Sequence, residues 1–464
     1  MSARCLRTAI VLAVVALLVS DRAWAQSQRI YAAKGSTLAE LDSNPAYLGQ
    51  VRRAWTLPGA PGPTPLSMTV AGAGRYLVWS LFETLSVFDT VTGALTTHAL
   101  EPSVVDIGIV GVSDEGDEVV LSAFEGGGAF RLVVWSASAG VVRSVPMACP
   151  RAFAYAPAVS QVMVLRMATC VFGPPSAQWI DVVDLRDGTI RERAFDVPFS
   201  TKQGIATNAA GTRLWVVSVA GYGGPAGYGA FDVRTGALLA VNGEVQAERR
   251  NRFATPKLAL DDARNLLLSV TTDGLAALDG DTLRLVGRAD APAYRLDERT
   301  LPPGYEATFS YEVLSHPDAA AVFAYEASGM TSSYHGGPCV QSALVALDPR
   351  TGLRLATKDL AQVAGQPLCF VQFAMAVAPA RPQGFQAAVT GLQVALSWEP
   401  PPRTTHYELE VGSAPGLRNL GVFTPGTNPF VVSDVPPGVY YVRLRALNYA
   451  GKGAYTDDLA IVVR

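Results

Sequence analysis

The chain has 464 residues, of which 17% are charged and 49% are hydrophobic, and its formal net charge is −3. This length exceeds one ordinary domain. Because no block of basic residues is present, the sequence gives no electrostatic support for binding nucleic acid or an anionic membrane surface. The four histidines lack metal-ligand spacing, and no nucleophile elbow, phosphate loop or dinucleotide fingerprint occurs. We therefore expect neither a metal nor a cofactor.

The first 25 residues have the three parts of a secretory signal peptide. Two arginines supply positive charge, residues 9–19 form an uncharged apolar stretch, and Ala23 and Ala25 are the small residues that a signal peptidase reads. The apolar stretch is shorter than the roughly 20 residues that span a bilayer. We expect cleavage before Gln26, no membrane span after cleavage, and an exported chain in the periplasm or the extracellular medium.

From residue 26 onward, one turn recurs at a near-constant interval. Its clear copies read DTVTG, DLRDG, DVRTG and DPRTG, and three degenerate copies accompany them. The seven copies start at positions 42, 89, 136, 184, 232, 279 and 348, so the steps are 47, 47, 48, 48, 47 and 69 residues. Strand-rich repeats of about 40–50 residues are typical of propeller-type arrays.

The turn itself has a mechanical explanation. An aspartate at its first position can accept backbone N–H groups, and a glycine at its last position permits positive φ, which closes a bulged hairpin. We therefore assign structural rather than ligand-binding roles to Asp89, Gly93, Asp184, Gly188, Asp232, Gly236, Asp348 and Gly352.

The order of strands within the repeats predicts a closed ring. Each unit reads as four strands, but residues 29–42 supply a second and a third strand without a first. Residues 368–379 resemble the opening strand of the other units, so they would complete the first unit and join the two ends of the array. We expect a seven-bladed β-propeller over residues 26–378. The pattern resembles the bacterial exported β-propellers of the YVTN/WD40-like class, although the Gly-His and Trp-Asp dipeptides of true WD40 repeats are absent. The resemblance implies the fold and leaves the function open.

After a Pro-containing linker at 379–382, residues 383–464 resemble a fibronectin type III domain. The matching pieces read VALSWEPP, HYELEVGS and VYYVRLRALNYAGKGAY. The resemblance implies a β-sandwich in which Trp398 lies in the core and Tyr440 forms the tyrosine corner. Such domains are spacers or adhesive modules. The whole chain is thus expected to be all-β, a propeller followed by a sandwich.

Four cysteines remain in the mature chain, and an even count in an exported protein indicates disulfides. On the propeller interpretation, Cys149 precedes the first strand of the fourth unit and Cys170 ends its second strand, so the two face each other. Cys339 follows the long loop of the seventh unit and Cys369 begins the ring-closing strand. We expect the pairs Cys149–Cys170 and Cys339–Cys369.

The same interpretation places the longest connections on one face of the ring, which we call the loop face. It is formed by the segments that join second to third strands and those that join successive units, including residues 170–179, 221–229, 248–253, 296–306 and 327–339. Aromatic rings beside guanidinium groups can stack on sugars or hold peptide side chains. The candidate ligand-binding residues are Phe172, Tyr222, Tyr228, Arg249, Arg250, Arg252, Tyr305, Tyr334 and His335.

Three functions fit this sequence. The first is a non-catalytic binding or adhesion protein that captures a glycan or a peptide partner on the loop face, with the type III domain as spacer. The second is a propeller-type enzyme, a lactonase or polysaccharide lyase, in which His335 with Glu298 or Glu306 would be the acid/base set. The third is a scaffold that works through protein partners. Missing catalytic motifs favour the first and the third. The loop aromatics could also simply pack on their own sheets, and the oligomeric state stays open.

Overall fold

The computed structural model describes residues 28–464 apart from short internal segments. The segments outside the description are 1–27, 35–36, 58–66, 114–116, 127, 169–176, 199–202, 219–226, 246–257, 262–263, 272–273, 291–304, 315–320, 333–335, 349–350, 352 and 361–371. The described elements are strands, apart from two short 3-10 helices, η1 (Gly72–Gly74) and η2 (Pro157–Val159). In this part of the chain the protein is all-β, as expected from the sequence.

Seven four-stranded antiparallel sheets follow one another between Gln28 and Val377 in the described residues. Six sheets use four strands that are consecutive in sequence, whereas one has the order β28-β1-β2-β3. Sheet by sheet, the strands are β28 (Gln372–Val377), β1 (Gln28–Lys34), β2 (Thr37–Leu41) and β3 (Val51–Thr56); β4 (Ser67–Ala71), β5 (Tyr76–Leu81), β6 (Thr84–Asp89) and β7 (Leu95–Ala99); β8 (Val104–Val112), β9 (Glu118–Glu125), β10 (Phe130–Ser136) and β11 (Gly140–Met147); β12 (Pro150–Ala156), β13 (Gln161–Met167), β14 (Gln178–Asp184) and β15 (Ile190–Asp196); β16 (Gln203–Thr207), β17 (Arg213–Ser218), β18 (Gly227–Asp232) and β19 (Leu238–Asn242); β20 (Leu258–Asp261), β21 (Leu266–Thr271), β22 (Gly274–Asp279) and β23 (Leu285–Asp290); β24 (Tyr305–Leu314), β25 (Val322–Ser332), β26 (Gly336–Leu347) and β27 (Arg354–Asp359).

The core lies between the sheets. The middle strands β5 and β17 read YLVWSL and RLWVVS and are buried on both faces along most of their length. The fourth strands β7 and β19 are largely exposed, because they lie at the outer edge of their sheets. Buried side chains form clusters that join neighbouring sheets, such as the cluster that contains Leu165 of β13 and Leu214 of β17. Apolar burial between adjacent sheets therefore holds the array together.

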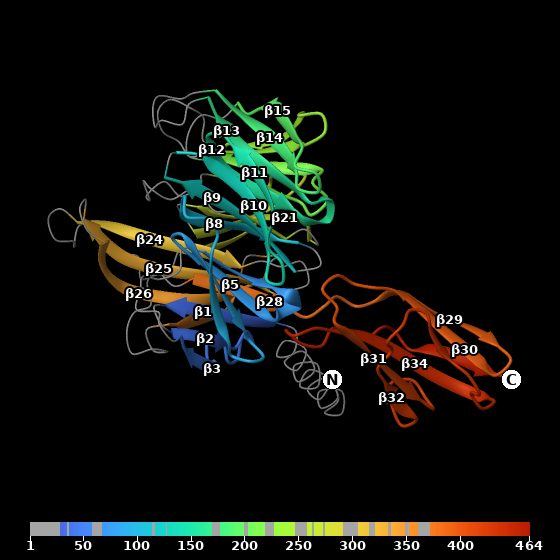
Figure 1. Ribbon diagram of the computed structural model, residues 1–464. Coiled ribbons are helices and arrows are strands. Elements are labelled where there is room, and N and C mark those ends of the chain that lie inside the picture. The colour runs from blue at the N-terminus through green and yellow to red at the C-terminus, as the bar shows by residue number, and fades with distance from the viewer. Residues whose placement is uncertain are drawn as a thin grey trace.

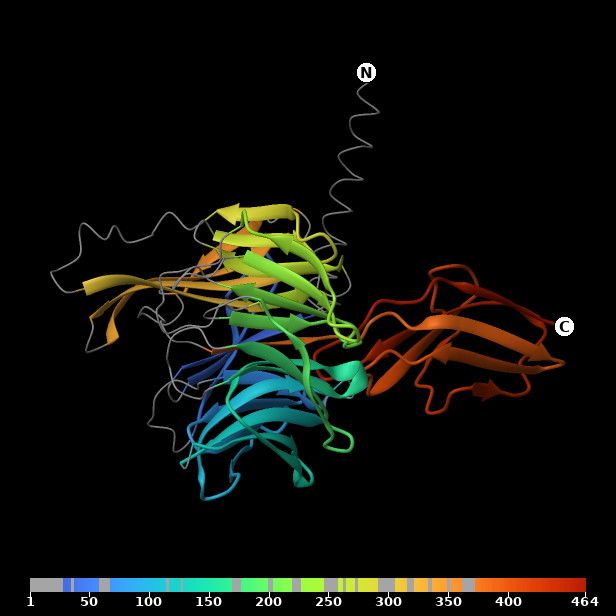
Figure 2. The same cartoon turned by 90° about the horizontal axis from the view of Figure 1, so that it is seen from above.

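The first strands of the sheets contact one another in a closed series. β28 contacts β4, and the contacts continue through β8, β12, β16, β20 and β24 back to β28. β28 also pairs antiparallel with β1, with Val377 opposite Gln28 and Gln372 opposite Ala33. The expected pairing of the two distant segments of the array is therefore present, and the sheets surround a common centre (Figures 1 and 2).

The recurring turns join third to fourth strands. Asp89 Oδ1 accepts the N–H groups of Val91 and Thr92 at 2.8 and 3.2 Å, and Gly93 has a φ of +73°. Gly352 lies outside the described residues. The remaining clear copies show Asp184 accepting from the N–H of Arg186, Asp232 from that of Thr235 and Asp348 from that of Thr351, with φ values of +79° at Gly188 and +72° at Gly236. Side-chain acceptors and left-handed glycines thus close these hairpins locally.

The last sheet of the ring is longer than the others and corrects part of the loop assignment. β24, β25 and β26 have 10, 11 and 12 residues, and they extend away from the ring on the side opposite the C-terminal domain (Figures 1 and 2). The expected loop at 327–339 is wrong for most of its length, because residues 327–332 belong to β25 and 336–339 to β26. Cross-strand pairing with β24 and β26 outweighs the turn-forming Gly and Ser residues of this stretch.

The C-terminal part forms two facing sheets. Their strands are β29 (Gln383–Thr390), β30 (Gln393–Glu399) and β33 (Phe430–Val432), and β32 (Gly421–Phe423), β31 (His406–Gly412), β34 (Gly438–Leu447) and β35 (Leu459–Val463). Trp398 is buried in the core between them with Leu409 and Leu444. The hydroxyl of Tyr440 donates to the carbonyl of Pro436 at 2.8 Å, which ties β34 to the segment before it.

The loop at residues 448–453 of this sandwich contacts the ring. The Asn448 side chain donates to the Val377 carbonyl at 3.0 Å, at the end of the ring-closing strand β28. The N–H of Tyr449 donates to the carbonyl of Ala73 in η1, and Arg29 Nε of β1 donates to the carbonyl of Ala450. Ala450 is buried in the same apolar cluster as β1 and β28 side chains. The sandwich therefore docks on the face that carries the hairpin turns, where the first strands end (Figure 2).

Candidate functional site

The opposite face is the loop face, where second strands end and third strands begin. Most of the candidate ligand-binding residues cannot be placed on it. Phe172, Tyr222, Arg249, Arg250, Arg252, Tyr334 and His335 lie outside the described residues, as does Glu298 of the acid/base hypothesis. Tyr305 and Glu306 are placed by their backbone only, as the first two residues of β24, paired with Ser332 and Thr331. The acid/base set is therefore untested.

The assignment of Tyr228 to the loop-face ligand set is wrong. Its side chain is fully buried, with an exposed fraction of 0%, and its hydroxyl donates to Ser269 Oγ of the neighbouring sheet at 2.9 Å. Burial raises the pKa of this phenol to about 12, and the hydrogen bond to Ser269 and the charge of Arg288 only partly offset that effect. Because β18 begins at Gly227, the side chain of Tyr228 already points between the sheets and joins them.

The cysteine pairing is only partly visible. Cys149 is disulfide-bonded and lies immediately before β12, where its carbonyl accepts the N–H of Met167 at the end of β13. Cys170 and Cys369 lie outside the described residues, and Cys339 is placed by its backbone alone in β26. The pairs Cys149–Cys170 and Cys339–Cys369 stay predictions.

Beside Cys149, the loop-face end of the fourth sheet carries a tryptophan flanked by two arginines. Trp179 is the second residue of β14, and the strand register places it opposite Arg166 of β13 and Asp196 of β15. The guanidinium carbons of Arg166 and Arg193 lie 5.4 and 5.5 Å from the centroid of the indole ring. These distances allow cation–π attraction between each guanidinium group and the partly buried ring. We call these residues, together with Asp181, the Trp179 cluster.

One buried carboxylate orders the Trp179 cluster. Asp181 has an exposed fraction of 0% and accepts two hydrogen bonds of 2.7 Å, from Arg166 Nη1 and from the N–H of Arg193. Arg193 occupies a bulge with a φ of +45°, and its Nε donates to Asp196 Oδ1 at 2.7 Å. A buried charge that accepts two charge-assisted or backbone bonds fixes its partners strongly. Asp181 thus fixes the Arg166 guanidinium and the backbone of Arg193 beside the indole, at the edge of the loop face.

The sequence reasoning missed this cluster. Trp179 was visible at the end of an expected loop, but Arg166 and Arg193 are far from it in sequence and come from two different strands. Only the strand register shows that they flank one ring. The sequence offered no clear signal for it, because the charged run at residues 191–193 lies on an exposed fourth strand, where charged residues are ordinary.

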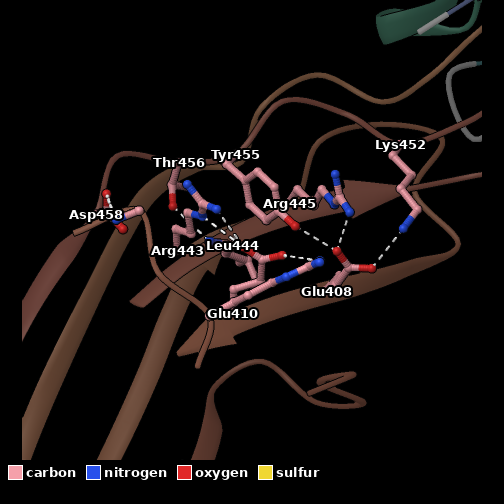
Figure 3. Close-up of polar contacts among 11 residues, drawn as sticks. Glu408, Glu410, Arg443, Leu444, Arg445, Lys452, Tyr455, Thr456 and Asp458 are labelled. Carbon is pink, nitrogen blue, oxygen red and sulfur yellow. Dashed lines mark hydrogen bonds and ion pairs between the residues drawn. The ribbon is translucent and has the colours of Figure 1, made fainter. Parts of the chain in front are cut away.

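A second polar cluster lies on the outer face of the sandwich (Figure 3). Glu408 and Glu410 project from β31 toward Arg445 and Arg443 of β34, with which they form ion pairs. Tyr455 crosses over both arginines, whose guanidinium carbons lie 4.3 and 4.5 Å from its ring centroid, and its hydroxyl donates to Glu408 Oε1 at 2.7 Å. Each carboxylate in the cluster has a partner, so the arrangement fixes the chain after β34 onto the sheet.

The hydrogen bonds of this cluster shift the pKa of Glu408. Burial alone would raise it, but hydrogen bonds from Tyr455, Lys452 and Arg445 outweigh burial and lower the pKa to about 2. The pKa of Tyr455 is raised, first by burial of its hydroxyl and then by its hydrogen bonds to the carboxylates of Glu410 and Glu408. Both groups are therefore held in one protonation state across the physiological range, ionised for Glu408 and neutral for Tyr455.

Replacing Glu408 by glutamine is expected to destabilise the chain at pH 7 by on the order of 1–2 kcal/mol, after allowance for solvent screening. Because the folded-state pKa lies below the unfolded value, the stabilisation by Glu408 is complete above about pH 4.5 and is lost as the pH falls toward 2. Urea denaturation of the full chain at pH 7, 5 and 3 should show the difference between Glu408→Gln and the parent shrink on acidification. The exposed Glu399→Gln is the matched control, and a pH-independent difference would contradict this role.

The described residues include the lining of a cavity in the sandwich and of a groove in the ring. One, of about 250 Å³, opens between the two sheets of the sandwich and is lined mainly by apolar side chains such as Leu396, Phe423 and Phe430. The other, of about 430 Å³, is a polar groove on the hairpin-turn face between β14 and β18, lined by residues that include Asp184, Arg191 and Asp232. No group of three or more metal-ligating side chains occurs among the described residues. Within them, no helix is long and apolar enough to span a membrane.

No protein-family model and no curated protein matches this chain. Among solved structures, it is similar to a functionally unknown protein from Desulfotomaculum acetoxidans DSM 771, with 11% identity, coverage of 71% of this chain and 98% of that chain, and a TM-score of 0.45. It is also similar to the dihydro-heme d1 dehydrogenase NirN in complex with DHE, at 12% identity, 72% and 73% coverage and a TM-score of 0.42. A chain of the mitotic checkpoint complex matches at 12% identity, 72% and 86% coverage and a TM-score of 0.40. At these TM-scores and identities the similarities identify neither a family nor an activity.

Proposed function

We propose that this chain is an exported binding protein whose ring is a seven-bladed β-propeller, residues 26–378, that captures a glycan or a peptide on its loop face. The seven four-stranded sheets and the closed series of contacts between their first strands support the propeller. The C-terminal module, residues 383–464, is proposed to be a fibronectin type III domain. Its two sheets, the buried Trp398 and the bond from the Tyr440 hydroxyl to the Pro436 carbonyl support that assignment.

One observation carries the binding proposal: the sandwich docks on the hairpin-turn face and leaves the loop face uncovered by it. The docking contacts run from the 448–453 loop to Val377, Ala73 and Arg29. All three residues lie on the hairpin-turn face. The long connections emerge from the other ends of the strands, and irregular connections on a rigid scaffold are where binding residues gather. In this proposal the sandwich is a fixed module rather than a loosely tethered spacer. Export rests on the signal-peptide pattern of residues 1–25.

The proposal predicts that aromatic substitutions on the loop face weaken ligand binding. A thermal-shift screen of the mature chain against polysaccharides, peptidoglycan fragments and peptides identifies a ligand, since a ligand of the folded state raises the melting temperature. Tyr222→Ala and Tyr334→Ala are then expected to lower the affinity by about 3- to 10-fold each, the loss of one aromatic contact.

Tyr47→Ala is the matched control for this test. Tyr47 is exposed, and it lies in the turn between β2 and β3 on the hairpin-turn face. Its removal should leave the affinity unchanged. The binding proposal fails if no loop-face substitution alters any ligand interaction, and an equal loss in Tyr47→Ala would move the binding surface to the hairpin-turn face.

A further inference from the structure

We infer that the polar groove between the fourth and fifth sheets of the ring binds the α-amino carboxylate group of a free amino acid. The groove lies on the hairpin-turn face, so this site is separate from the loop-face surface of the proposed function and does not depend on it. Three observations support the inference: an open groove of suitable volume, an arginine that the fold leaves unpaired, and donors and acceptors that match a zwitterion.

The groove has room for such a ligand and is open to solvent. Its volume is about 430 Å³, within the range of about 300–1,000 Å³ that is typical of small-molecule sites. The fourth sheet contributes Asp184 and Arg191 to its lining, and the turn between β18 and β19 contributes Asp232 and Arg234. Both arginines are exposed, so a ligand can reach their guanidinium groups from solvent.

Arg234 is the cation that the fold leaves without a partner. It is the third residue of the recurring turn. In the preceding turn Arg186 occupies the same position, and its Nε donates to its own turn's Asp184 at 3.0 Å. In the following turn Asp281 occupies the position and forms an ion pair with Arg213 of the neighbouring sheet. Among the described residues, the Arg234 side chain forms neither a hydrogen bond nor an ion pair, so it is available to an anionic group.

The groups around Arg234 complement a zwitterion. Arg191 Nη2 donates to the carbonyl of Val233 at 2.8 Å, which places this second guanidinium beside the turn that carries Arg234. Two neighbouring guanidinium groups can share one carboxylate. Asp232 Oδ1 accepts the N–H and the hydroxyl of Thr235 at 2.7 and 2.8 Å. Because both bonds use Oδ1, Oδ2 keeps its lone pairs for an ammonium group next to the ligand carboxylate.

The charges that line the groove favour a zwitterion over a simple anion or cation. Asp184 is already paired with Arg186, which leaves Arg191, Arg234 and Asp232 as two positive charges and one negative charge. A lone carboxylate would be attracted by the arginines but repelled by Asp232, and a lone amine would meet the reverse. A ligand that carries both groups on one carbon pairs each with its opposite charge.

The test is an NMR titration of the full mature chain with leucine, with isocaproate, which lacks the ammonium group, and with isoamylamine, which lacks the carboxylate. Leucine is chosen because the apolar side chains of Val182 and Val233 belong to the groove lining. Leucine is expected to bind at least about 10-fold more tightly than either analogue, since each analogue loses one charge-assisted contact. Arg234→Gln should lower the leucine affinity about 5- to 10-fold without changing the melting temperature. Arg53→Gln, at an exposed arginine of β3, is the matched control and should leave the affinity unchanged.

A second variant tests the ammonium contact. Asp232→Asn keeps an oxygen that can accept from Thr235, so the hairpin stays closed, but it removes the negative charge. It should lower the affinity for leucine and raise that for isocaproate. Equal binding of leucine and isocaproate to the parent chain would overturn the amino-acid assignment. The site itself is overturned if no probe binds, or if binding is unchanged in Arg234→Gln. Neither result affects the loop-face proposal, which Tyr222→Ala and Tyr334→Ala test on the other face.

Discussion

Trp215→Ala is expected to destabilise the ring by about 3–5 kcal/mol, the cost of deleting a large buried aromatic side chain. Trp215 lies in β17 with an exposed fraction of 1% and packs against Leu267, Leu278 and Leu283 of the next sheet. Its indole N–H donates to the carbonyl of Gly280 at 2.9 Å, so one side chain joins two neighbouring sheets by packing and by a hydrogen bond. Chemical denaturation of the full chain measures the loss.

A second substitution separates the two contributions of this side chain. Trp215→Phe keeps most of the packing but leaves the buried Gly280 carbonyl without its donor, which costs about 1–3 kcal/mol. Phe82→Ala, at an exposed turn between β5 and β6, is the control and should change stability by less than about 0.5 kcal/mol. If Trp215→Ala cost no more than Phe82→Ala, contacts between sheets would not be what holds the ring together.

Asn448→Ala is expected to uncouple the sandwich from the ring, so that one cooperative unfolding transition becomes two. The Asn448 side chain satisfies the Val377 carbonyl and also accepts the N–H groups of Ala450 and Gly451, at 2.9 and 3.1 Å, which shapes the docking loop. Removing it leaves a buried carbonyl at the end of the ring-closing strand unpaired, at a cost of about 1–3 kcal/mol. Differential scanning calorimetry of the full chain distinguishes one transition from two.

The uncoupling has an independent test and a control. Gly74 of η1 has a φ of +94°, and a Cβ there would lie 2.9 Å from the Ala450 nitrogen, so Gly74→Val should separate the same two surfaces without touching Asn448. Asn419→Ala changes an exposed asparagine that bonds only within its own loop, and it should leave the single transition intact. Two transitions already present in the parent chain would show that the docking contacts do not couple the modules.

This coupling bears on how the two modules can be studied. Since the docking loop contacts both β28 and β1, the sandwich braces the place where the ring closes. Deleting residues 382–464 would therefore weaken ring closure as well as remove the sandwich. A loss of partner capture in such a truncation would not by itself identify the sandwich as the binding surface. Substitutions at Tyr222 and Tyr334 avoid this difficulty.

The sequence by itself predicted the features whose signals are local. The recurring Asp and Gly residues mark turns because each turn is closed within five residues. In the turn from Asp89 to Gly93, the Asp89 carboxylate accepts the N–H of Val91, and Gly93 supplies the positive φ. The strand order within a unit exposed the missing first strand, and the pairing of β28 with β1 follows from it. The buried Trp398 and the Tyr440 hydroxyl bond likewise depend on a compact, self-contained module.

What only the tertiary structure decided depends on register and on contacts between distant segments. The glycine-rich stretch before Tyr228 led to its assignment to a loop. In the structure β18 begins at Gly227, so the Tyr228 side chain points between two sheets instead. Residues 327–332 and 336–339 became strand because pairing across three strands outweighs local turn preference. The Trp179 cluster exists because β13 and β14 place Arg166 opposite Trp179, while a bulge in β15 brings Arg193 close to the same ring. Asn448 joins the two modules because the ring exposes the Val377 carbonyl to its side chain. Side chains that meet across strands and modules leave no periodic pattern in the sequence, so their roles followed only from the folded chain.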